Sequence, residues 1–272
     1  HPGIKAYTHV NDRFAPFASR TIPATVSEAP YLLDRLTMNE AGRRIEEQYA
    51  DTGGFTDHLF GISAMLGCRL VLRIRDLPSK RLYVFDPAAT PSELRPLVGG
   101  KAREALIVSN WPDLFRCAAT MSAGQVAPSS ILRKLASYPR QNDLASALRE
   151  VGRIERTLFI IEWILDVGMQ RRAQVGLNKG EAHHALKNAL RIGRQGEIRD
   201  RTTEGQHYRI AGLNLLTAII VYWNTLHLGH AVEARRREGL DTPDHLLAHI
   251  SPLGWAHILL TGEYLWPKDA GA

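Results

Sequence analysis

The sequence predicts an α/β fold followed by a large helical part, and three observations carry this prediction. Over roughly the first hundred residues, short apolar runs alternate with helical patterns, which is the order expected for strands joined by helices. From about Trp111 onward, long helical patterns take over and strand candidates are few. Of the 272 residues, 44 % are hydrophobic, enough to bury a substantial core. We therefore expect a globular protein.

The strand candidates lie in the first part of the chain. "AYTHV" (6–10), "RLVLRIRDL" (69–77) and "RLYVFD" (81–86) are rich in residues that favour strands. "RIEEQYA" (44–50) is ambiguous by propensity but short enough to be a strand. The end of such a strand is where an α/β sheet exposes side chains to a ligand.

Two helices are expected between these strands. "SEAPYLLDRLTMNE" (27–40) has helical spacing of its apolar residues and opens with Ser27 as a possible N-cap. "FTDHLFGISAMLG" (55–67) is expected to be a helix that ends at Gly67. Asp57 falls in its first turn, where a carboxylate complements the helix dipole.

The second part of the chain consists mainly of helical patterns. A stretch rich in Pro and Gly, 86–102, precedes it and is the best candidate for a domain boundary. The main helical patterns are "SSILRKLASY", "DLASALREVGRIERTLFIIEWIL", "KGEAHHALKNALRIG", "GLNLLTAIIVYWNTLHLGHAVEARRR" and "TPDHLLAHI". We find no internal repeat and no low-complexity tract.

Charge and cysteine content narrow the class of protein. The formal charge of +6, from 34 basic against 28 acidic residues, favours polyanions such as nucleic acid without demonstrating them. Cys68 and Cys117 form no CxxC, so reduced thiols are expected and a structural zinc site is not. The apolar run Leu213 to Trp223 is shorter than the ~20 residues of a membrane span. With no signal-peptide pattern at the N-terminus, we expect a soluble cytoplasmic protein without a membrane partner.

Asp51 is the first candidate for a functional carboxylate. In "QYADTGGF" it stands where a strand candidate meets a glycine pair, a position at which an α/β sheet can present an acid to a ligand. Asp also caps turns and helices in such positions, and local sequence alone favours that structural role.

Glu181 is the second candidate. On a helical wheel of 179–193 it sits at the edge of an apolar stripe, while Lys187, Arg191 and Arg194 cluster on the opposite flank. From the rim of a buried face, a carboxylate can reach a metal ion. An acid in the first turn of a helix is also an ordinary partner of the helix dipole, so the local sequence leaves both roles open.

Other acids and histidines compete for a functional role. The adjacent His183 and His184 match no zinc-ligand spacing. A dense mixture of charges in "GEIRDRTTEGQHYR" most often forms a solvated salt-bridge network, although its arginines would hold phosphates in a DNA-processing protein. This mixture contains Glu197, Arg199, Arg201, Glu204 and Arg209.

Several long segments, in order along nearly the whole chain, carry a family likeness. They are "AYTHVNDRFAPF", "YADTGGFTDHLF", "LRIRDLPSKRLY", "LRKLASYPRQNDLASALREVGRIERTLFIIEW", "GLNKGEAHHALKNALRIGRQGEIRDRTTEGQHYRIAGLNLLTAIIVYWNT" and "LLAHISPLGWAHILLTGEYLW". Together they resemble the C-terminal catalytic region of transposases of the Tn-three family. This resemblance implies a ribonuclease-H-like domain with an Asp, Asp, Glu metal triad.

Carried over to this sequence, the resemblance matches the second Asp of the triad to Asp51 and its Glu to Glu181. Such carboxylates hold two Mg²⁺ ions about 3.5–4 Å apart, with Mn²⁺ a plausible substitute, so we expect the two carboxylates within roughly 4–8 Å. A nearer Glu197 or Glu204 would shift the third carboxylate to that residue. The first Asp of the family lies upstream of the "AYTHV" match, and Asp12 does not replace it. The chain alone is therefore expected to be inactive.

The resemblance also implies an organisation and a reaction. We expect a partial ribonuclease-H-like core over 1–100, a helical insertion over 101–175, and the Glu181 helix with C-terminal helices over 176–272. The implied reaction is metal-dependent DNA strand nicking and strand transfer in replicative transposition, on transposon ends and target DNA, with self-association in the complex. The alternative is an inactive remnant that binds DNA or full-length transposase. Candidate DNA contacts are Arg73, Arg75, Lys80, Arg81, Lys179, Lys187, Arg191, Arg194, Arg199, Arg201 and Arg209.

Overall fold

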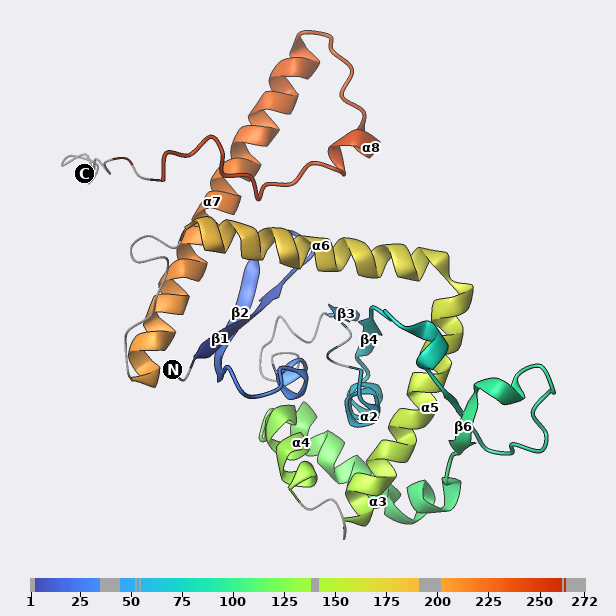
Figure 1. The fold of residues 1–272 in the computed structure, drawn as a ribbon. Helices are drawn as coiled ribbons and strands as arrows, with labels where there is room; N and C mark the ends of the chain where they lie inside the picture. The colour runs from blue at the N-terminus through green and yellow to red at the C-terminus, as the bar shows by residue number, and fades with distance from the viewer. Residues whose placement is uncertain are drawn as a thin grey trace. The chain divides into compact units, whose positions relative to one another are not determined.

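The computed structural model describes residues 3–34, 45–51, 53, 55–137, 142–190, 202–260 and 262. It is a mixed α/β structure in which helices predominate, as Figure 1 shows. The chain divides into two compact units. The first comprises His1–Gly3 and Pro23–Asn178, and the second Ile4–Ile22 and Lys179–Ala272. The division expected at 100 and 175 stays a prediction.

A strand–helix–strand unit in the first compact unit positions Asp51. Strands β3 (Glu47–Ala50) and β4 (Arg69–Leu72) pair in parallel and are connected through helix α2 (Asp57–Met65), which confirms these three expected elements. The Oγ1 atom of Thr56 accepts a hydrogen bond from the backbone N of Leu59 and caps the helix. The helix is followed by Gly67 at a φ of +70°, a conformation that glycine adopts without steric cost.

Helix α5 (Asp143–Leu165) packs directly against α2 (Figure 1). Two glycines allow this close approach. A Cβ atom on Gly152 would lie 1.6 Å from the carbonyl oxygen of Asp57, and one on Gly61 would lie 2.6 Å from that of Leu148. The backbones of the two helices are therefore nearly in contact at this crossing.

A second parallel strand pair, β5 (Leu82–Val84) and β6 (Val98–Lys101), is tied to α5 because the backbone N of Tyr83 donates to Thr157 Oγ1 over 2.9 Å. Strand β6 lies within the Pro- and Gly-rich stretch 86–102. The remaining elements of this unit are η1 (Ala29–Tyr31), η4 (Leu77–Ser79), η5 (Arg95–Leu97), α3 (Glu104–Ser122) and α4 (Pro128–Ala136).

Several expected boundaries differ from the structure. Within the expected helix 27–40, the described part contains the short 3-10 helix η1 and the helical residue Asp34, and residues 35–40 lie outside the described residues. The strand expected over 69–77 ends at Leu72, and the 3-10 helix η4, which contains Pro78, follows it. Pairing ends at Leu72 because its partner Ala50 is the last residue of β3.

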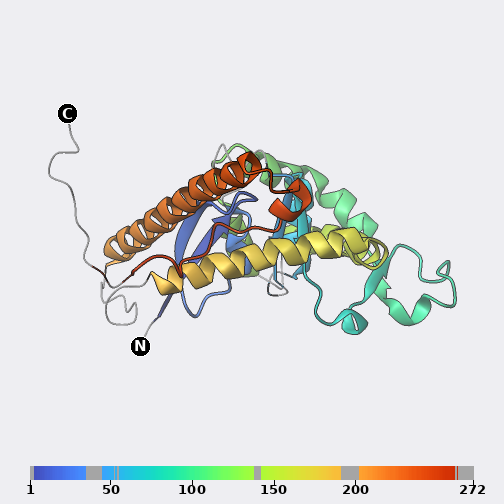
Figure 2. The same ribbon diagram turned by 90° about the horizontal axis from the view of Figure 1, so that it is seen from above.

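The second unit combines a strand pair with helices. Strands β1 (Ile4–Val10) and β2 (Pro16–Pro23) pair with each other, and in both views they lie between α7 (Thr203–Arg237) and the end of α6 (Figures 1 and 2). Helix α6 (Val167–Ala189) passes from the first unit into the second at Asn178. A short helix, α8 (Asp244–Leu247), follows α7.

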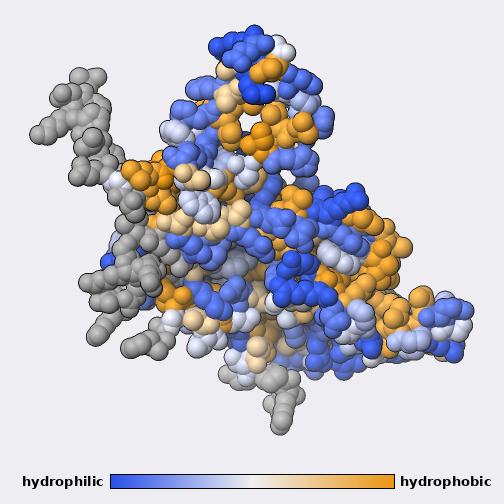
Figure 3. Space-filling view, turned by 45° about the horizontal axis from the view of Figure 1, so that its top comes forward, coloured by the Kyte–Doolittle hydropathy of each residue, from blue (hydrophilic) through white to orange (hydrophobic). Residues whose placement is uncertain are grey.

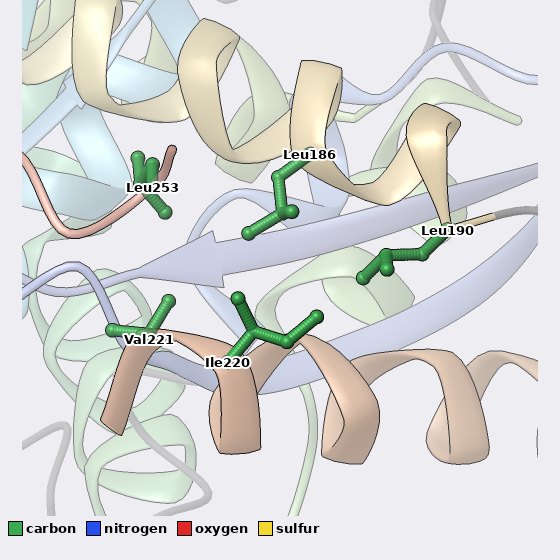
Figure 4. Packing of buried hydrophobic residues seen from close by; sticks show 5 residues of the cluster. All are labelled: Leu186, Leu190, Ile220, Val221 and Leu253. Carbon is green, nitrogen blue, oxygen red and sulfur yellow. The ribbon is translucent and has the colours of Figure 1, made fainter. Parts of the chain in front are cut away.

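The core of the second unit is a compact apolar cluster. Side chains from α6, α7 and the segment after α8 point toward one another, as Figure 4 shows. The five buried members are Leu186, Leu190, Ile220, Val221 and Leu253. This packing explains why 179–193 reads as a helix with one apolar face.

Asn224 closes one end of this core. Its Nδ2 atom donates to the carbonyl oxygens of Pro252 (2.6 Å) and Gly254 (2.8 Å), and its Oδ1 atom lies 2.8 Å from Nε2 of His257. Asn224 is 5 % exposed, so these bonds replace water at a buried site.

We expect Asn224→Ala to lower the free energy of unfolding by about 2 kcal/mol, because it leaves two partly buried carbonyl groups without a donor. Urea unfolding followed by circular dichroism measures the change. Thr225→Ala is the matched control, since Thr225 is exposed and bonds only within its own helix turn among its described contacts. Equal stability of the two variants would contradict the role of Asn224.

Helix α7 also carries apolar residues on its exposed side. They include Tyr208, Leu215, Ile219, Tyr222 and Leu226. Figure 3 shows that hydrophobic (orange) patches interrupt the hydrophilic surface on the face that it draws. Within the described residues, α7 is the one helix long and apolar enough to cross a membrane, and 28 % of its apolar window is buried inside the protein. A single helix of this kind is weak evidence for a span, since core helices of soluble proteins share the same length and composition.

Both cysteines are free thiols, as the sequence predicts. Burial raises the pKa of the Cys68 thiol to about 11. Because the thiolate is the reactive form, Cys68 is a poor nucleophile.

Candidate active site

Asp51 lies directly after β3, at the carboxyl end of the parallel strand pair. Its Oδ1 atom is 3.4 Å from Nη2 of Arg73, and its Oδ2 atom is 2.7 Å from Nη2 of Arg75. Both arginines follow β4, the strand paired with β3. The structure therefore brings together three residues that the sequence analysis singled out, and it adds a contact between them.

Exposure differs among these three side chains. The Asp51 side chain is 48 % exposed, Arg75 is 62 % exposed and Arg73 is 25 % exposed. The carboxylate is thus accessible to solvent and to a ligand. Two guanidinium groups against one carboxylate make the local charge positive, which suits a site for phosphate groups.

The other two basic candidates of the first unit lie beyond η4. Lys80 places its Nζ atom 4.8 Å from the centre of the Phe55 ring, a cation–π contact. The Nη1 atom of Arg81 donates to the carbonyl oxygens of Pro78 (2.8 Å) and Lys80 (3.1 Å). Neither residue has a described contact with Asp51.

Asp57, the first residue of α2, has the structural role that the sequence favours. It forms ion pairs with Arg156 (2.7 Å) and Arg153 (3.7 Å) of α5. Arg153 also pairs with Glu150, a carboxylate with 0 % exposed side chain. These contacts hold α2 and α5 together. Helix α2 connects β3, the strand that precedes Asp51, to β4.

Glu181 lies on α6 and is exposed, in the second unit. Lys179 on the same helix donates from Nζ to the carbonyl oxygen of Asp12 over 2.9 Å and lies 4.7 Å from the Phe14 ring centre. Asp51 and Glu181 therefore belong to different compact units. Their expected separation stays a prediction.

Lys187, on the flank of the helical wheel opposite the apolar stripe, is buried in the structure. Lys187 is 6 % exposed, and its Nζ atom donates to Thr8 Oγ1 of strand β1 over 2.9 Å. The helical wheel could not show that β1 covers this flank of α6. Its proposed contact with DNA stays untested, but the buried ammonium first serves to join the helix to β1.

His183, two residues after Glu181, is buried with 2 % exposure, and its Nε2 atom has no hydrogen-bond partner among the described residues. Burial, together with the positive charges of Lys187 and His184, lowers the pKa of His183 from 6.5 to about 4. The neutral imidazole is therefore the form that fits the fold.

We expect acid to destabilise the protein through His183. Because its folded pKa lies below its unfolded pKa, the unfolded chain binds the proton first, and stability falls as the pH drops from about 6.5 to about 4. The contribution of this residue is at most about 1.4 kcal/mol per pH unit. Urea unfolding at several pH values should show a shallower loss for His183→Gln than for the wild type.

The control for this measurement is His184→Gln, which changes an exposed histidine on the same helix. It should retain the steeper acid dependence of the wild type. A His183→Gln profile as steep as that of the control would show that other groups cause the acid dependence.

The remaining candidates are distributed along α7 and the segment before it. Arg209 is exposed on α7, and Glu204 in the first turn of that helix accepts a hydrogen bond from the Tyr208 hydroxyl over 3.2 Å. Five candidates lie outside the described residues: Arg191, Arg194, Glu197, Arg199 and Arg201.

Asp51 is the first possible ligand for a divalent cation at this site. Asp51 offers an accessible carboxylate, the hard oxygen ligand that Mg²⁺ prefers, provided that the Arg75 guanidinium leaves Oδ2. Among the described residues, no group of three or more His, Cys, Asp or Glu side chains could hold a metal ion. Asp51 thus fits as one ligand of a cation, and further oxygen ligands must come from elsewhere.

Comparison with known proteins identifies the family of the chain. A model of the family described as "Tn3 transposase DDE domain" matches residues 1–264. The chain belongs to this family. The expected likeness, drawn from motifs spread over the same range, is confirmed.

Individual proteins that are similar to the chain are also named as transposases. The chain is 48 % identical over 269 residues to the transposase of transposon Tn21 from Escherichia coli. The matched region covers 99 % of the chain and 27 % of that relative. It is 49 % identical over 268 residues to the transposase of Tn501 from Pseudomonas aeruginosa (98 % of the chain, 27 % of the relative). It is also 43 % identical over 262 residues to the transposase of Tn1546 from Enterococcus faecium (96 % and 26 %). The chain thus spans about a quarter of the length of these relatives.

No solved structure matches the chain. The mixed α/β architecture is therefore described from this chain alone.

The sequence analysis missed the contact of Arg73 and Arg75 with Asp51. A signal for it was present: 44–50 and 69–77 both read as strands with a helix between them. Strands joined in this way are normally parallel, so the residues after each strand meet at the same edge.

Proposed function

We propose that this chain is the catalytic portion of a DNA transposase that nicks DNA strands and transfers them in replicative transposition, with divalent metal ions as cofactors. The observation that carries the proposal is the match to the Tn3 transposase DDE domain over residues 1–264. The relatives that match at 48–49 % identity are named as transposases of transposons Tn21 and Tn501.

The fold that we propose for the core is ribonuclease-H-like, extended by helices. The parallel β3–α2–β4 unit supports it, because such units place acidic residues at the carboxyl ends of strands. Asp51 stands at that position.

We propose Asp51 and Glu181 as the carboxylates of the metal site. Bound Mg²⁺, or Mn²⁺ in its place, would activate the attacking oxygen and stabilise the leaving 3′ oxygen. The Asp51 carboxylate supplies negative charge at the end of β3, and Arg73 orients it through Oδ1. Glu181 on α6 is an exposed carboxylate that can serve as a second ligand.

The basic residues would hold the DNA backbone. Arg75 and Arg209 are exposed, so their guanidinium groups can reach phosphates. DNA at transposon ends and target sites is the proposed partner, together with further copies of the transposase. The proposed location is the cytoplasm, on the nucleoid when DNA is bound.

A graft tests this function. The chain replaces the matching segment of the Tn21 transposase, and the chimera is assayed for mobilisation of a Tn21-ended transposon and, after purification, for cation-dependent nicking of the ends. We expect both activities, and we expect a chelator to abolish nicking.

The corresponding segment of the Tn501 transposase, grafted in the same way, controls for the graft itself. An active Tn501 chimera beside a folded but inactive chimera of this chain would contradict the proposal.

A further inference from the structure

Arg73 and Arg75 contact different oxygen atoms of the Asp51 carboxylate, and they are held there differently. Ala50 pairs with Leu72 in the parallel register, and the backbone N of Arg73 donates to the carbonyl oxygen of Ala50 over 3.1 Å. Arg73 is therefore held next to Asp51 by the sheet itself. Arg75 lies two residues further along, beyond the paired residues, and reaches back to Oδ2.

The two arginines also differ in the exposure of their side chains. The Arg73 side chain is 25 % exposed, whereas that of Arg75 is 62 % exposed. A largely buried guanidinium such as that of Arg73 is more costly to release than an exposed one, because it would lose its partner and gain less water. An exposed ion pair is weak, so Arg75 can leave the carboxylate easily.

A divalent cation and Arg75 compete for the same oxygen atom. A cation bound at Oδ2 would lie at the place of the Arg75 guanidinium, and two positive groups at that distance repel strongly. Arg75 must then move into solvent or to another anion. In a DNA complex, the nearest new anions are backbone phosphates, which a guanidinium binds in bidentate fashion.

We propose that Arg75 is a mobile counter-charge: it pairs with Asp51 Oδ2 when no cation is bound and transfers to a DNA phosphate when a cation takes that oxygen. The proposal rests on the proposed function, since it requires Asp51 to bind a cation. Arg73 stays on Oδ1 in both states and keeps the carboxylate in place. Arg75 is thus a positioning residue that links cation binding to DNA binding.

This exchange makes the two ligands cooperative. A cation frees Arg75 for DNA, so it tightens DNA binding, and by thermodynamic linkage DNA tightens cation binding by the same factor. A purely structural ion pair between Arg75 and Asp51 would affect stability but would create no such linkage.

The experiment uses the full 272-residue chain and two binding measurements. Mn²⁺ binding without DNA is followed by electron paramagnetic resonance, and binding of a fluorescent DNA duplex by anisotropy, with and without Ca²⁺, which avoids cleavage. The variants are Arg75→Gln, Asp51→Asn and Arg95→Gln. Arg95→Gln is the matched control, because it removes one exposed positive charge whose guanidinium bonds to the backbone carbonyl of Thr90 and has no described contact with Asp51.

For Arg75→Gln we expect Mn²⁺ to bind about fivefold more tightly without DNA, because a competing positive charge is removed. Ca²⁺ should tighten DNA binding by the wild type and by Arg95→Gln, and it should not do so for Arg75→Gln. Thermal melting verifies that each variant is folded.

Two results would overturn the proposal, and they differ in meaning. If Arg75→Gln keeps the Mn²⁺ affinity and the Ca²⁺ effect of the wild type, Arg75 is not the link, while Asp51 can still be a ligand. If Asp51→Asn leaves Mn²⁺ affinity unchanged, Asp51 is not a ligand, and both this proposal and the proposed metal site fail.

Discussion

Asp51→Asn should reduce transposition by the Tn21 chimera at least about 1000-fold, which corresponds to a loss of about 4 kcal/mol of transition-state stabilisation. The substitution keeps the size of the side chain but removes the negative charge that a hard cation requires. It also leaves Arg73 and Arg75 without their described carboxylate partner, so the site becomes more positive and repels a cation further. Mobilisation frequency and nicking of the transposon ends both report the loss.

Asp76→Asn is the matched control for this substitution. Asp76 is an exposed acid that follows the partner strand β4 and precedes η4, and its side chain makes no capping hydrogen bond. It should retain activity close to that of the unmodified chimera. Activity above a tenth of that level in Asp51→Asn would show that Asp51 has no part in the chemistry.

Gly152→Ala should destabilise the first compact unit by at least about 4 kcal/mol. The added Cβ would lie 1.6 Å from the carbonyl oxygen of Asp57 and 2.4 Å from its carbonyl carbon. Because both atoms belong to the backbone of α2, no side-chain rotation can relieve the clash. Helices α2 and α5 would have to separate, and the ion pairs of Asp57 with Arg153 and Arg156 would lengthen.

Urea unfolding of the isolated chain, followed by circular dichroism, measures this effect. Gly229→Ala is the control, because a Cβ there meets nothing within 4 Å and the residue lies inside α7. It should stabilise α7 by up to about 1 kcal/mol through its higher helix propensity. A Gly152→Ala protein within 1 kcal/mol of the wild type would disprove the close crossing of α2 and α5.

Much of the local structure could be predicted because its causes are local. The helix pattern of 55–67, its end at Gly67 and the place of Asp57 in its first turn all depend on residues a few positions apart. The stretch 44–50 before Asp51 is ambiguous by propensity, and its short length favoured the strand that the structure shows over 47–50. The family also followed from the sequence, since it depends on the order of long motifs and on no contact between them.

Other features depend on segments that are distant in the chain. Strand β6 lies in a stretch whose glycines and prolines indicate a loop, and only its pairing with β5 makes it a strand. Gly152 looks like an ordinary weak position within a helix until α2 is placed against it. Neither residue pattern contains information about its partner.

The charged residues show the same division between sequence and tertiary structure. The sequence by itself determined the family and indicated Asp51 and Glu181 as candidate carboxylates. Only the tertiary structure decided that β1 covers Lys187 and that Arg73 and Arg75 meet the Asp51 carboxylate. The physical reason is that burial and ion pairing depend on distances in space, whereas helix and strand periodicity depends on neighbours along the chain.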